Sequence, residues 1–366
     1  LSLQAAVAQA PVESGQKLTL DVSITGDLVI DDAWLSQQGI ANGATLQVQA
    51  TGNITLRNIN MTLASLSLNA GGEVRGSLSA NSAIGSLSIT AVSDIALVNL
   101  SSAALTVAGL SSGSDTQTGN ISLRTSGAMT VIGTVKAQNV TLESAASMST
   151  GIDGLVSAMK LALYTAAGDV GSAAAAFNLD LQDSASGVSG LINGAAYLHE
   201  ISGDLSLNRL VVTGTASLST LAGAIVGNAS GGFADLKAGT LNVSTLGGGL
   251  GRAANEGLVA DALVLSTASL SASVAGSVLI NTQGTLNVSE LSVTGTNSVV
   301  DVQSRGDLTL SGGVSSAGGA INLFMRGEFN QDQGSAIDTA GGNLNIQSVR
   351  GSVSQAAGAT VSTSGS

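Results

Sequence analysis

The 366-residue chain has no cysteine, one proline, and only 1 Trp, 2 Tyr and 4 Phe. The absence of cysteine excludes disulfide crosslinks and thiolate metal sites. A globular core in a chain of this length would normally use many more aromatic side chains. The core must therefore be built from Val, Leu, Ile and Ala, and a narrow core of small aliphatic residues stacked on one another fits this supply.

Charge is also scarce. Charged residues make up 10% of the chain, with 24 acidic against 12 basic residues and a net charge of −12. Because no basic stripe is present to neutralise phosphates, we expect no nucleic-acid partner. No run of about 18 apolar residues occurs, so we expect no transmembrane helix. The 44% of hydrophobic residues alternate strongly with polar ones, which does not indicate disorder.

Glycine, in contrast, is abundant, with 48 residues. Three similar segments near the C-terminus each end in Arg-Gly, at Arg305, Arg326 and Arg350. A longer echo places residues 203–207 at 81 positions before residues 284–288. Self-similarity at a period of roughly 20 to 25 residues predicts a solenoid of stacked supersecondary units. The residues that recur 24 positions later are Arg326, Gly327, Phe329, Gln331, Gly334, Ile337 and Thr339.

Short segments with apolar residues at every second position run through the chain, bounded by Gly, Ser, Asn or Asp. They predict short β-strands on the faces of a triangular coil, each pairing with its equivalents one coil above and below. The predicted fold is an all-β, right-handed parallel β-helix with about 20 residues per coil and about 18 coils. The clearest strands begin at Leu18, Thr45, Asn53, Ser65, Gly85, Asn120, Asn139 and Thr240.

Interruptions of this pattern predict the remaining local structure. Residues 111–119, 187–196 and 247–257 are rich in Gly, Ser and Ala and predict loops that protrude from the solenoid. The apolar residues of segment 155–167 fit the two-residue period of a strand as well as the period of a helix, and we expect a strand there. Residues 173–176 are four alanines in a row, for which we expect one helical turn in a loop.

The domain prediction is one continuous β-solenoid of imperfect repeats over residues 18–366. Residues 1–17 form an N-terminal segment or coil of open status. The Ala8-Gln9-Ala10 triplet resembles a signal-peptidase site, but it follows no basic region and no proper apolar core. The favoured interpretation is an internal coil of a longer chain. The last residues show no visible cap, which predicts either a piece of something larger or a unit that stacks end to end.

The only histidine, His199, lies between Tyr197 and Glu200 in the segment Tyr-Leu-His-Glu. Such a cluster offers ligand-binding or acid–base chemistry. Residues 81 positions later include Val278 and Ile280, which indicates an apolar pair at the equivalent site. We therefore favour a packed or surface role for His199 in a strand.

The acidic residues show no stacked arrangement that would hold calcium or flank a glycosidic bond. Asp183 and Asp204 lie about one coil apart, but no third acid continues their register. Adjacent Asp31 and Asp32 indicate a turn, and Asp115 an ordinary loop. We therefore expect no catalytic, metal or cofactor site, and the sequence leaves a ligand-binding site open.

Three further features remain to be interpreted. Arg305, Arg326 and Arg350 recur at coil spacing, so they either stack their guanidinium groups along one edge or are surface residues before a glycine turn. Trp34, the single tryptophan, is expected to cover an end or a loop. The glycines at residues 168–171 and 247–251 lack the Lys-Ser/Thr of a phosphate loop, so we interpret them as turn residues.

The coils resemble the parallel β-helix shafts of filamentous-haemagglutinin-like adhesins, which are large surface or secreted proteins of Gram-negative bacteria. The matching motifs are Gly-Asp-Leu-Ser-Leu at 203–207, Gly-Asp-Leu-Thr-Leu at 306–310, Gly-Asp-Val-Gly at 168–171, and Ala-Gly-Gly-Asn-Leu-Asn-Ile at 340–346. The resemblance covers most of the chain from about Leu18 onward. The N-terminal secretion domain of such adhesins is not evident, so the export route stays open.

Repeat architecture without site chemistry predicts a non-enzymatic structural or adhesive rod of an exported bacterial surface or matrix protein. We expect it to be secreted or displayed on the cell surface and to act in attachment, biofilm or fibre formation. The expected partners are a host or matrix glycan or protein, or further copies stacked end to end. The alternative is a polysaccharide-binding or polysaccharide-cleaving β-helix protein, which predicts an acidic groove and aromatic sugar platforms. Ice binding is a distant third, since no Thr-x-Thr ladder repeats in register.

Overall fold

The computed structural model describes residues 19–113, 118–182, 187–252 and 261–363. These residues form 33 β-strands and one short α-helix, and the strands pair in parallel as a β-solenoid of about 14 turns with ~21 residues per turn. The predicted fold class is confirmed. The expected number of about 18 coils is wrong, because some coils carry long turns: Thr240 pairs with Ser269, 29 positions later.

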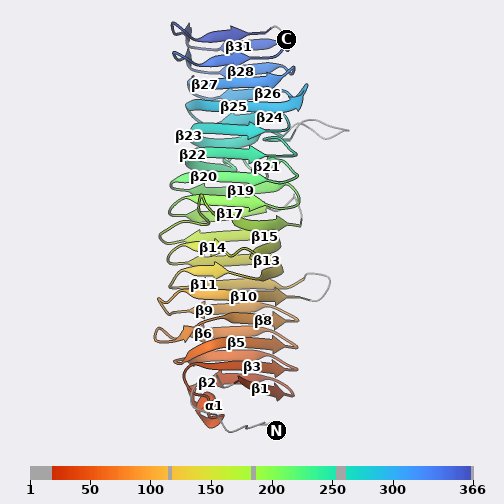
Figure 1. The fold of residues 1–366 in the computed structure, drawn as a ribbon, viewed down its shortest axis with the longest axis vertical. Coiled ribbons are helices and arrows are strands. Elements are labelled where there is room, and N and C mark those ends of the chain that lie inside the picture. Colours follow the sequence, from red (N-terminus) through yellow and green to blue (C-terminus); the bar gives the residue numbers. More distant parts are fainter. Residues whose placement is uncertain (1–18, 114–117, 183–186, 253–260, 364–366) are drawn as a thin grey trace. The chain divides into compact units, whose positions relative to one another are not determined.

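Contacts divide the chain into two compact units, residues 1–171 and 172–366, and each is described by itself. The predicted single solenoid over residues 18–366 therefore stays a prediction. Residues 1–17 lie outside the described residues, as do Asp115 and Asp183. Figure 1 shows the strands within each unit stacked coil upon coil.

The first unit contains the helix and fifteen strands. They are α1 (Asp32–Gln37), β1 (Thr19–Ile24), β2 (Leu28–Asp31), β3 (Ala44–Ala50), β4 (Ile54–Ile59), β5 (Thr62–Ala70), β6 (Val74–Leu78), β7 (Ala83–Ile84), β8 (Leu87–Ala91), β9 (Ile95–Asn99), β10 (Leu105–Ser112), β11 (Asn120–Thr125), β12 (Met129–Val131), β13 (Thr134–Ser144), β14 (Met148–Thr150) and β15 (Leu155–Thr165).

The second unit contains the other strands. They are β16 (Phe177–Leu181), β17 (Gly187–Ile192), β18 (Ala196–Glu200), β19 (Leu205–Val212), β20 (Thr215–Thr220), β21 (Ile225–Gly227), β22 (Leu236–Thr245), β23 (Leu263–Val274), β24 (Val278–Thr282), β25 (Leu286–Thr296), β26 (Val300–Ser304), β27 (Leu308–Ala317), β28 (Ile321–Met325), β29 (Phe329–Gln331), β30 (Ala336–Asp338), β31 (Leu344–Ser348), β32 (Val353–Gln355) and β33 (Thr360–Ser362).

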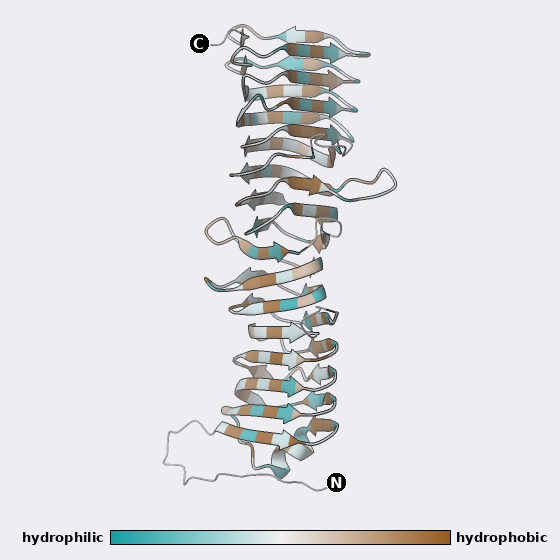
Figure 2. Cartoon of the chain, turned by 90° about the vertical axis from the view of Figure 1, so that its right-hand side faces the viewer, coloured by the Kyte–Doolittle hydropathy of each residue, from teal (hydrophilic) through white to brown (hydrophobic). Residues whose placement is uncertain are grey.

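Alternation along many of the strands produces the buried core. In β11 the inward residues are buried and the outward ones exposed, in strict alternation. Hydropathy alternates visibly along many strands (Figure 2). Because parallel pairing puts like positions one above another, the inward residues stack into columns. In the first unit, Leu97, Leu123, Leu142 and Leu163 form one such column.

The second unit contains a longer column that no polar residue interrupts. Each member pairs in register with the next, from β16 to β33, so the narrow aliphatic core expected from the composition is observed. Its members are Phe177, Leu198, Leu218, Val243, Ala272, Leu291, Val314, Ile337 and Val361.

The Gly-Asp-Leu motif, which begins at Gly26, Gly203 and Gly306, ties its own coil to the next at each of these three places. The carboxylate of its aspartate accepts a hydrogen bond from a backbone N–H one coil further along the chain. Asp27 accepts from the N–H of Asn53 at 2.7 Å, Asp204 from Ala224 at 2.8 Å, and Asp307 from Glu328 at 2.8 Å. The motif used for the family resemblance therefore has a structural role in this chain. We call these contacts the aspartate staples.

Buried hydroxyls close many of the turns. A Ser or Thr at the end of a strand donates to the carbonyl oxygen three residues later, which satisfies an otherwise unpaired backbone acceptor. Thr220 bonds Gly223 at 2.5 Å, and Thr339 bonds Gly342 at 2.6 Å. We call these contacts the hydroxyl corners. The others with the same spacing to glycine are at Thr165, Thr245, Ser316 and Ser348.

Most predicted strands are confirmed, including β15, but three local predictions are wrong. Residues 187–196 are not a loop, because β17 and the start of β18 occupy them. Residues 173–176 contain no helix. The one helix, α1, begins at Asp32 with Asp31 as its N-cap, since the Asp31 carboxylate accepts the N–H of Trp34 at 2.8 Å. The pair of aspartates therefore starts a helix rather than a turn.

The short period of the sequence is confirmed at the C-terminal end, and the long one is not. Phe329 pairs with Val353 and Ile337 with Val361, both 24 positions apart. The 81-residue echo instead relates residues of different columns. The column of Leu205 continues through Ile225 and Leu250 to Val278, and it does not include Leu286, the residue 81 positions after Leu205. The comparison of His199 with Ile280 therefore does not hold.

Candidate functional site

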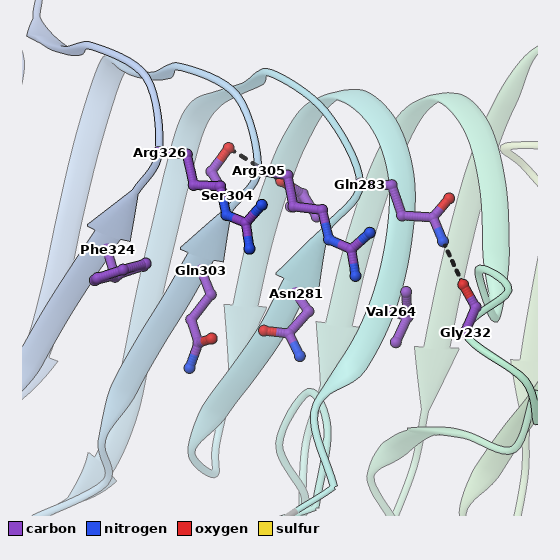
Figure 3. A pocket seen from close by; sticks show the side chains of 10 residues that line it. Gly232, Val264, Asn281, Gln283, Gln303, Ser304, Arg305, Phe324 and Arg326 are labelled. Carbon is purple, nitrogen blue, oxygen red and sulfur yellow. Dashed lines mark hydrogen bonds between the residues drawn. The ribbon is translucent and has the colours of Figure 1, made fainter. Parts of the chain in front are cut away.

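A cavity of about 230 Å³ opens on the second unit where β24, β26 and β28 lie side by side (Figure 3). We call it the arginine groove. The residues that line it are Gly232, Val264, Asn281, Thr282, Gln283, Gln303, Ser304, Arg305, Phe324 and Arg326.

The floor of the arginine groove is one outward column. Val264, Asn281, Gln303 and Phe324 pair in register on successive coils. Neighbouring strands lie about 4.8 Å apart, so these side chains repeat at that spacing. The floor therefore offers two amides and one aromatic ring in a line.

The rim of the groove is a second row, formed by the first residue after each strand. Arg305 donates its backbone N–H to Thr282 and Arg326 to Ser304, which holds both in the same register, and Gln283 occupies the same position one coil earlier. Figure 3 shows the three side chains in a row above the floor. Among the described residues, neither arginine forms an ion pair, although the chain is strongly acidic.

A loop between β21 and β22 closes one end of the groove. Its Gly232 carbonyl accepts a hydrogen bond from Nε2 of Gln283 at 3.0 Å. The ring of Phe233 lies 4.2 Å from the guanidinium carbon of Arg209, a cation–π contact. The buried carboxylate of Asp235 holds the base of the loop, accepting from the N–H of Ala229 at 2.6 Å and of Val264 at 2.8 Å. Burial raises the pKa of Asp235, and the backbone donors oppose that shift.

The opposite side of the floor is acidic. Asp261 and Asp301 line an adjoining hollow that shares Val264, Asn281 and Gln303 with the groove. Oδ1 of Asn281 is buried without a hydrogen-bond partner, and such an acceptor costs about 1–3 kcal/mol. The site thus presents cations on one rim, carboxylates on the other, and amides between them.

Two of the three predicted arginines come together here. Arg350 does not join them, because the equivalent position one coil on is Val349, which donates its N–H to Met325. One extra residue in that turn shifts Arg350 out of register. The stacked-arginine interpretation is therefore correct for Arg305 and Arg326 alone.

Tyr197 and His199 face outward from β18, whereas Glu200 faces inward, so the structure does not bring the three side chains together. Nδ1 of His199 lies 2.8 Å from the hydroxyl of Ser219 on the next coil, and Tyr197 stacks on Ser217. Glu200 points inward and is fully buried, where it occupies the position of a hydroxyl corner in the column of Thr220 and Thr245. The favoured packing interpretation agrees with these contacts.

The buried carboxylate of Glu200 is held by backbone donors. It accepts from the N–H of Leu181 at 2.9 Å, of Ser202 at 3.2 Å and of Gly203 at 3.4 Å. Burial raises the pKa of Glu200; the backbone bonds lower it, and nearby Asp180 raises it further. The net direction is upward, so the folded chain binds this proton more tightly than the unfolded chain.

We expect Glu200→Gln to flatten the dependence of stability on pH. The stabilising contribution of the raised pKa is complete below the unfolded value of 4.5 and is lost as pH rises through the folded pKa. The free energy of unfolding, measured by denaturant titration from about pH 4 to about pH 8, should therefore fall less steeply in the variant than in the wild type. The control is Glu290→Gln at an exposed position of β25. Equal slopes for the wild type and Glu200→Gln would contradict the assignment.

The other predicted acids have structural partners. Asp204 forms an aspartate staple and an ion pair with Arg252 at 3.2 Å. Oδ1 of Asp32 accepts the N–H of Asn60 at 2.8 Å. Trp34 lies in α1, half-buried. Over the described ranges, no three His, Cys, Asp or Glu side chains gather in a way that would hold a metal ion. No helix in that part of the chain is long and apolar enough to cross a membrane.

Sequence reasoning missed the floor of the arginine groove, although a signal for it exists. Asn281, Gln303 and Phe324 each stand two positions before Gln283, Arg305 and Arg326. In each of these pairs the strand ends at the residue that separates the two. The earlier residue of the pair therefore faces outward on the floor, and the later one is the first residue after the strand and belongs to the rim.

No protein-family model, curated protein or solved structure matches this chain.

Proposed function

We propose that this chain is a non-enzymatic structural or adhesive solenoid of an exported bacterial surface or matrix protein, of the kind found in filamentous-haemagglutinin-like adhesins. The observation that carries the proposal is the use of the acidic side chains. Asp27, Asp204, Asp307, Glu200 and Asp235 are all engaged by backbone N–H groups that link or close coils. Their chemistry serves the solenoid, which presents regular outward columns for attachment.

Retention on surfaces tests the proposal. Beads coated with the purified protein should be held under flow on at least one immobilised glycan or matrix protein, unlike beads coated with an inert globular protein. A parallel assay of soluble polysaccharides should release no new reducing ends. Catalytic release of reducing ends, or retention on no surface, would contradict the proposal. Antibody labelling of intact producing cells tests the surface location, and labelling only after lysis would contradict it.

The proposal includes association of copies in the stacking direction. Among the described residues, β32 and β33 each pair with one earlier strand, β29 and β30. Val353 and Val361 are 57% and 45% exposed, whereas their partners Phe329 and Ile337 are 1% exposed. An apolar strand edge of this kind pairs readily with another strand, here that of a second copy.

Val361→Lys should therefore weaken self-association by at least about tenfold, since an edge lysine opposes strand addition. Sedimentation velocity over a concentration series measures the effect, and electron microscopy shows whether fibres form. Val92→Lys, at a position 58% exposed in the first unit, is the matched control. A wild type that stays monomeric at every concentration would remove this part of the proposal.

A further inference from the structure

The two arginines of the arginine groove have no acidic partner among the described residues. Arg305 and Arg326 lie one coil apart, exposed and without an ion pair among the described residues. In a chain with a net charge of −12, two unpaired cations in one row attract an anion locally against the field of the whole protein. Arginine presents a planar donor fork that matches a carboxylate.

The floor specifies more than an anion. The ring of Phe324 lies at one end of it and the amides of Gln303 and Asn281 continue the line. Asp301 accepts from Nε2 of Gln303 at 3.4 Å and offers a further acceptor on the side opposite the arginines. A ligand that satisfies this set carries a carboxylate on one side, hydroxyl donors on the other, and an apolar face. A sugar acid has all three, whereas an inorganic anion has only the first.

We propose that the arginine groove binds a linear polysaccharide of uronic acid residues, laid along the stacking direction. A carboxylate of the chain pairs with Arg305 and Arg326 on the rim, one ring packs on Phe324, and hydroxyls bond the amides. The two arginines repeat at the strand spacing of about 4.8 Å, so both reach one sugar. This inference rests on the proposed function, for which it names the ligand class.

The loop that closes the groove positions the rim. Gln283 is held by the Gly232 carbonyl, and Asp235 anchors the loop to the backbone of Val264 at the end of the floor. One end of the bound polysaccharide therefore lies against this loop. The other end of the groove, beyond Arg326 and Phe324, is open, so the polysaccharide can extend in that direction.

Binding of a tetragalacturonate by isothermal titration calorimetry tests the inference. Arg305→Gln and Arg326→Gln should each weaken binding by roughly tenfold, because each removes a charge-assisted pair. Arg350→Gln removes the same charge from the same end of the unit but does not line the groove, so its affinity should stay within about twofold. Phe324→Ala should weaken binding without changing its dependence on salt.

Chemically matched probes separate the possible outcomes. The methyl-esterified tetramer should bind at least about tenfold more weakly than the acid. No binding of the acid, equal binding of acid and ester, or equal loss in Arg350→Gln would each overturn the inference. Preference for a sulfated tetramer over the uronate would overturn the carboxylate assignment. Beads retained on other surfaces, with no uronate binding, would refute this inference alone; beads retained nowhere would refute the proposed function as well.

Discussion

Replacing Leu123 with aspartate is expected to lower the free energy of unfolding by more than about 4 kcal/mol and to melt the coils around it. Leu123 is 1% exposed and lies in the column between Leu97 and Leu142. A carboxylate there is surrounded by leucine side chains and finds no donor, because the backbone groups of β11 are engaged in the ladders on both sides. The removed leucine also leaves its neighbours in the column without contact atoms.

Chemical denaturation and circular dichroism measure this effect. The control is Ser122→Asp, one residue away in the same strand but exposed, which should change the free energy of unfolding by no more than about 0.5 kcal/mol. Because each coil contacts mainly its neighbours, the Leu123→Asp transition should broaden or split as the damaged coils unfold first. Similar losses in the two variants would show that the inward and outward faces of β11 are wrongly assigned.

Gly312→Ala is expected to destabilise by about 3 kcal/mol, while Gly313→Ala, at the next residue, changes little. Gly312 lies in a β-bulge of β27, since Val288 pairs with Leu310 and Glu290 with Gly313, which leaves two residues of β27 opposite Ser289. A Cβ on Gly312 would fall well inside contact distance of the backbone carbonyl oxygen of Ser289 on the preceding coil. Backbone atoms cannot turn aside as a flexible side chain can, so the two coils must separate.

A Cβ on Gly313 would meet nothing within 4 Å. Gly313→Ala should therefore stay within about 1 kcal/mol of the wild type, and any change should favour the folded state by restricting the unfolded chain. Thermal melts of both variants decide the matter. A Gly312→Ala protein as stable as the wild type would place the bulge elsewhere in β27.

The fold was predictable because alternation and the turn residues specify it locally. Segments such as β3 and β11 alternate strictly and carry their own boundaries. The longest strands were harder, because β22 and β23 run through a corner of the coil and pair with different strands in their two halves. The sequence shows only a brief break in alternation at such a corner, so β22 was predicted as a shorter strand beginning at Thr240, and no strand was predicted at the residues of β23.

The arginine groove was only half predictable for a related reason. The recurrence of Arg305 and Arg326 is visible in the sequence, but the shift of Arg350 depends on a single added residue in a turn. The spacing between like positions varies with the length of each turn, as Leu263–Ile280 and Thr240–Ser269 show. Only the ladder fixes which side chains stand above one another.

The aspartate staples and hydroxyl corners have an evolutionary consequence. Each aspartate staple joins one coil only to the next, and each hydroxyl corner lies within a single turn. A module of ~21 residues that brings its own aspartate and hydroxyl can therefore be inserted or deleted by recombination without repacking distant coils. Natural variants of this protein should accordingly differ in length by whole modules, and modules bearing the Arg305 and Arg326 pattern are the units through which binding strength can be multiplied or lost.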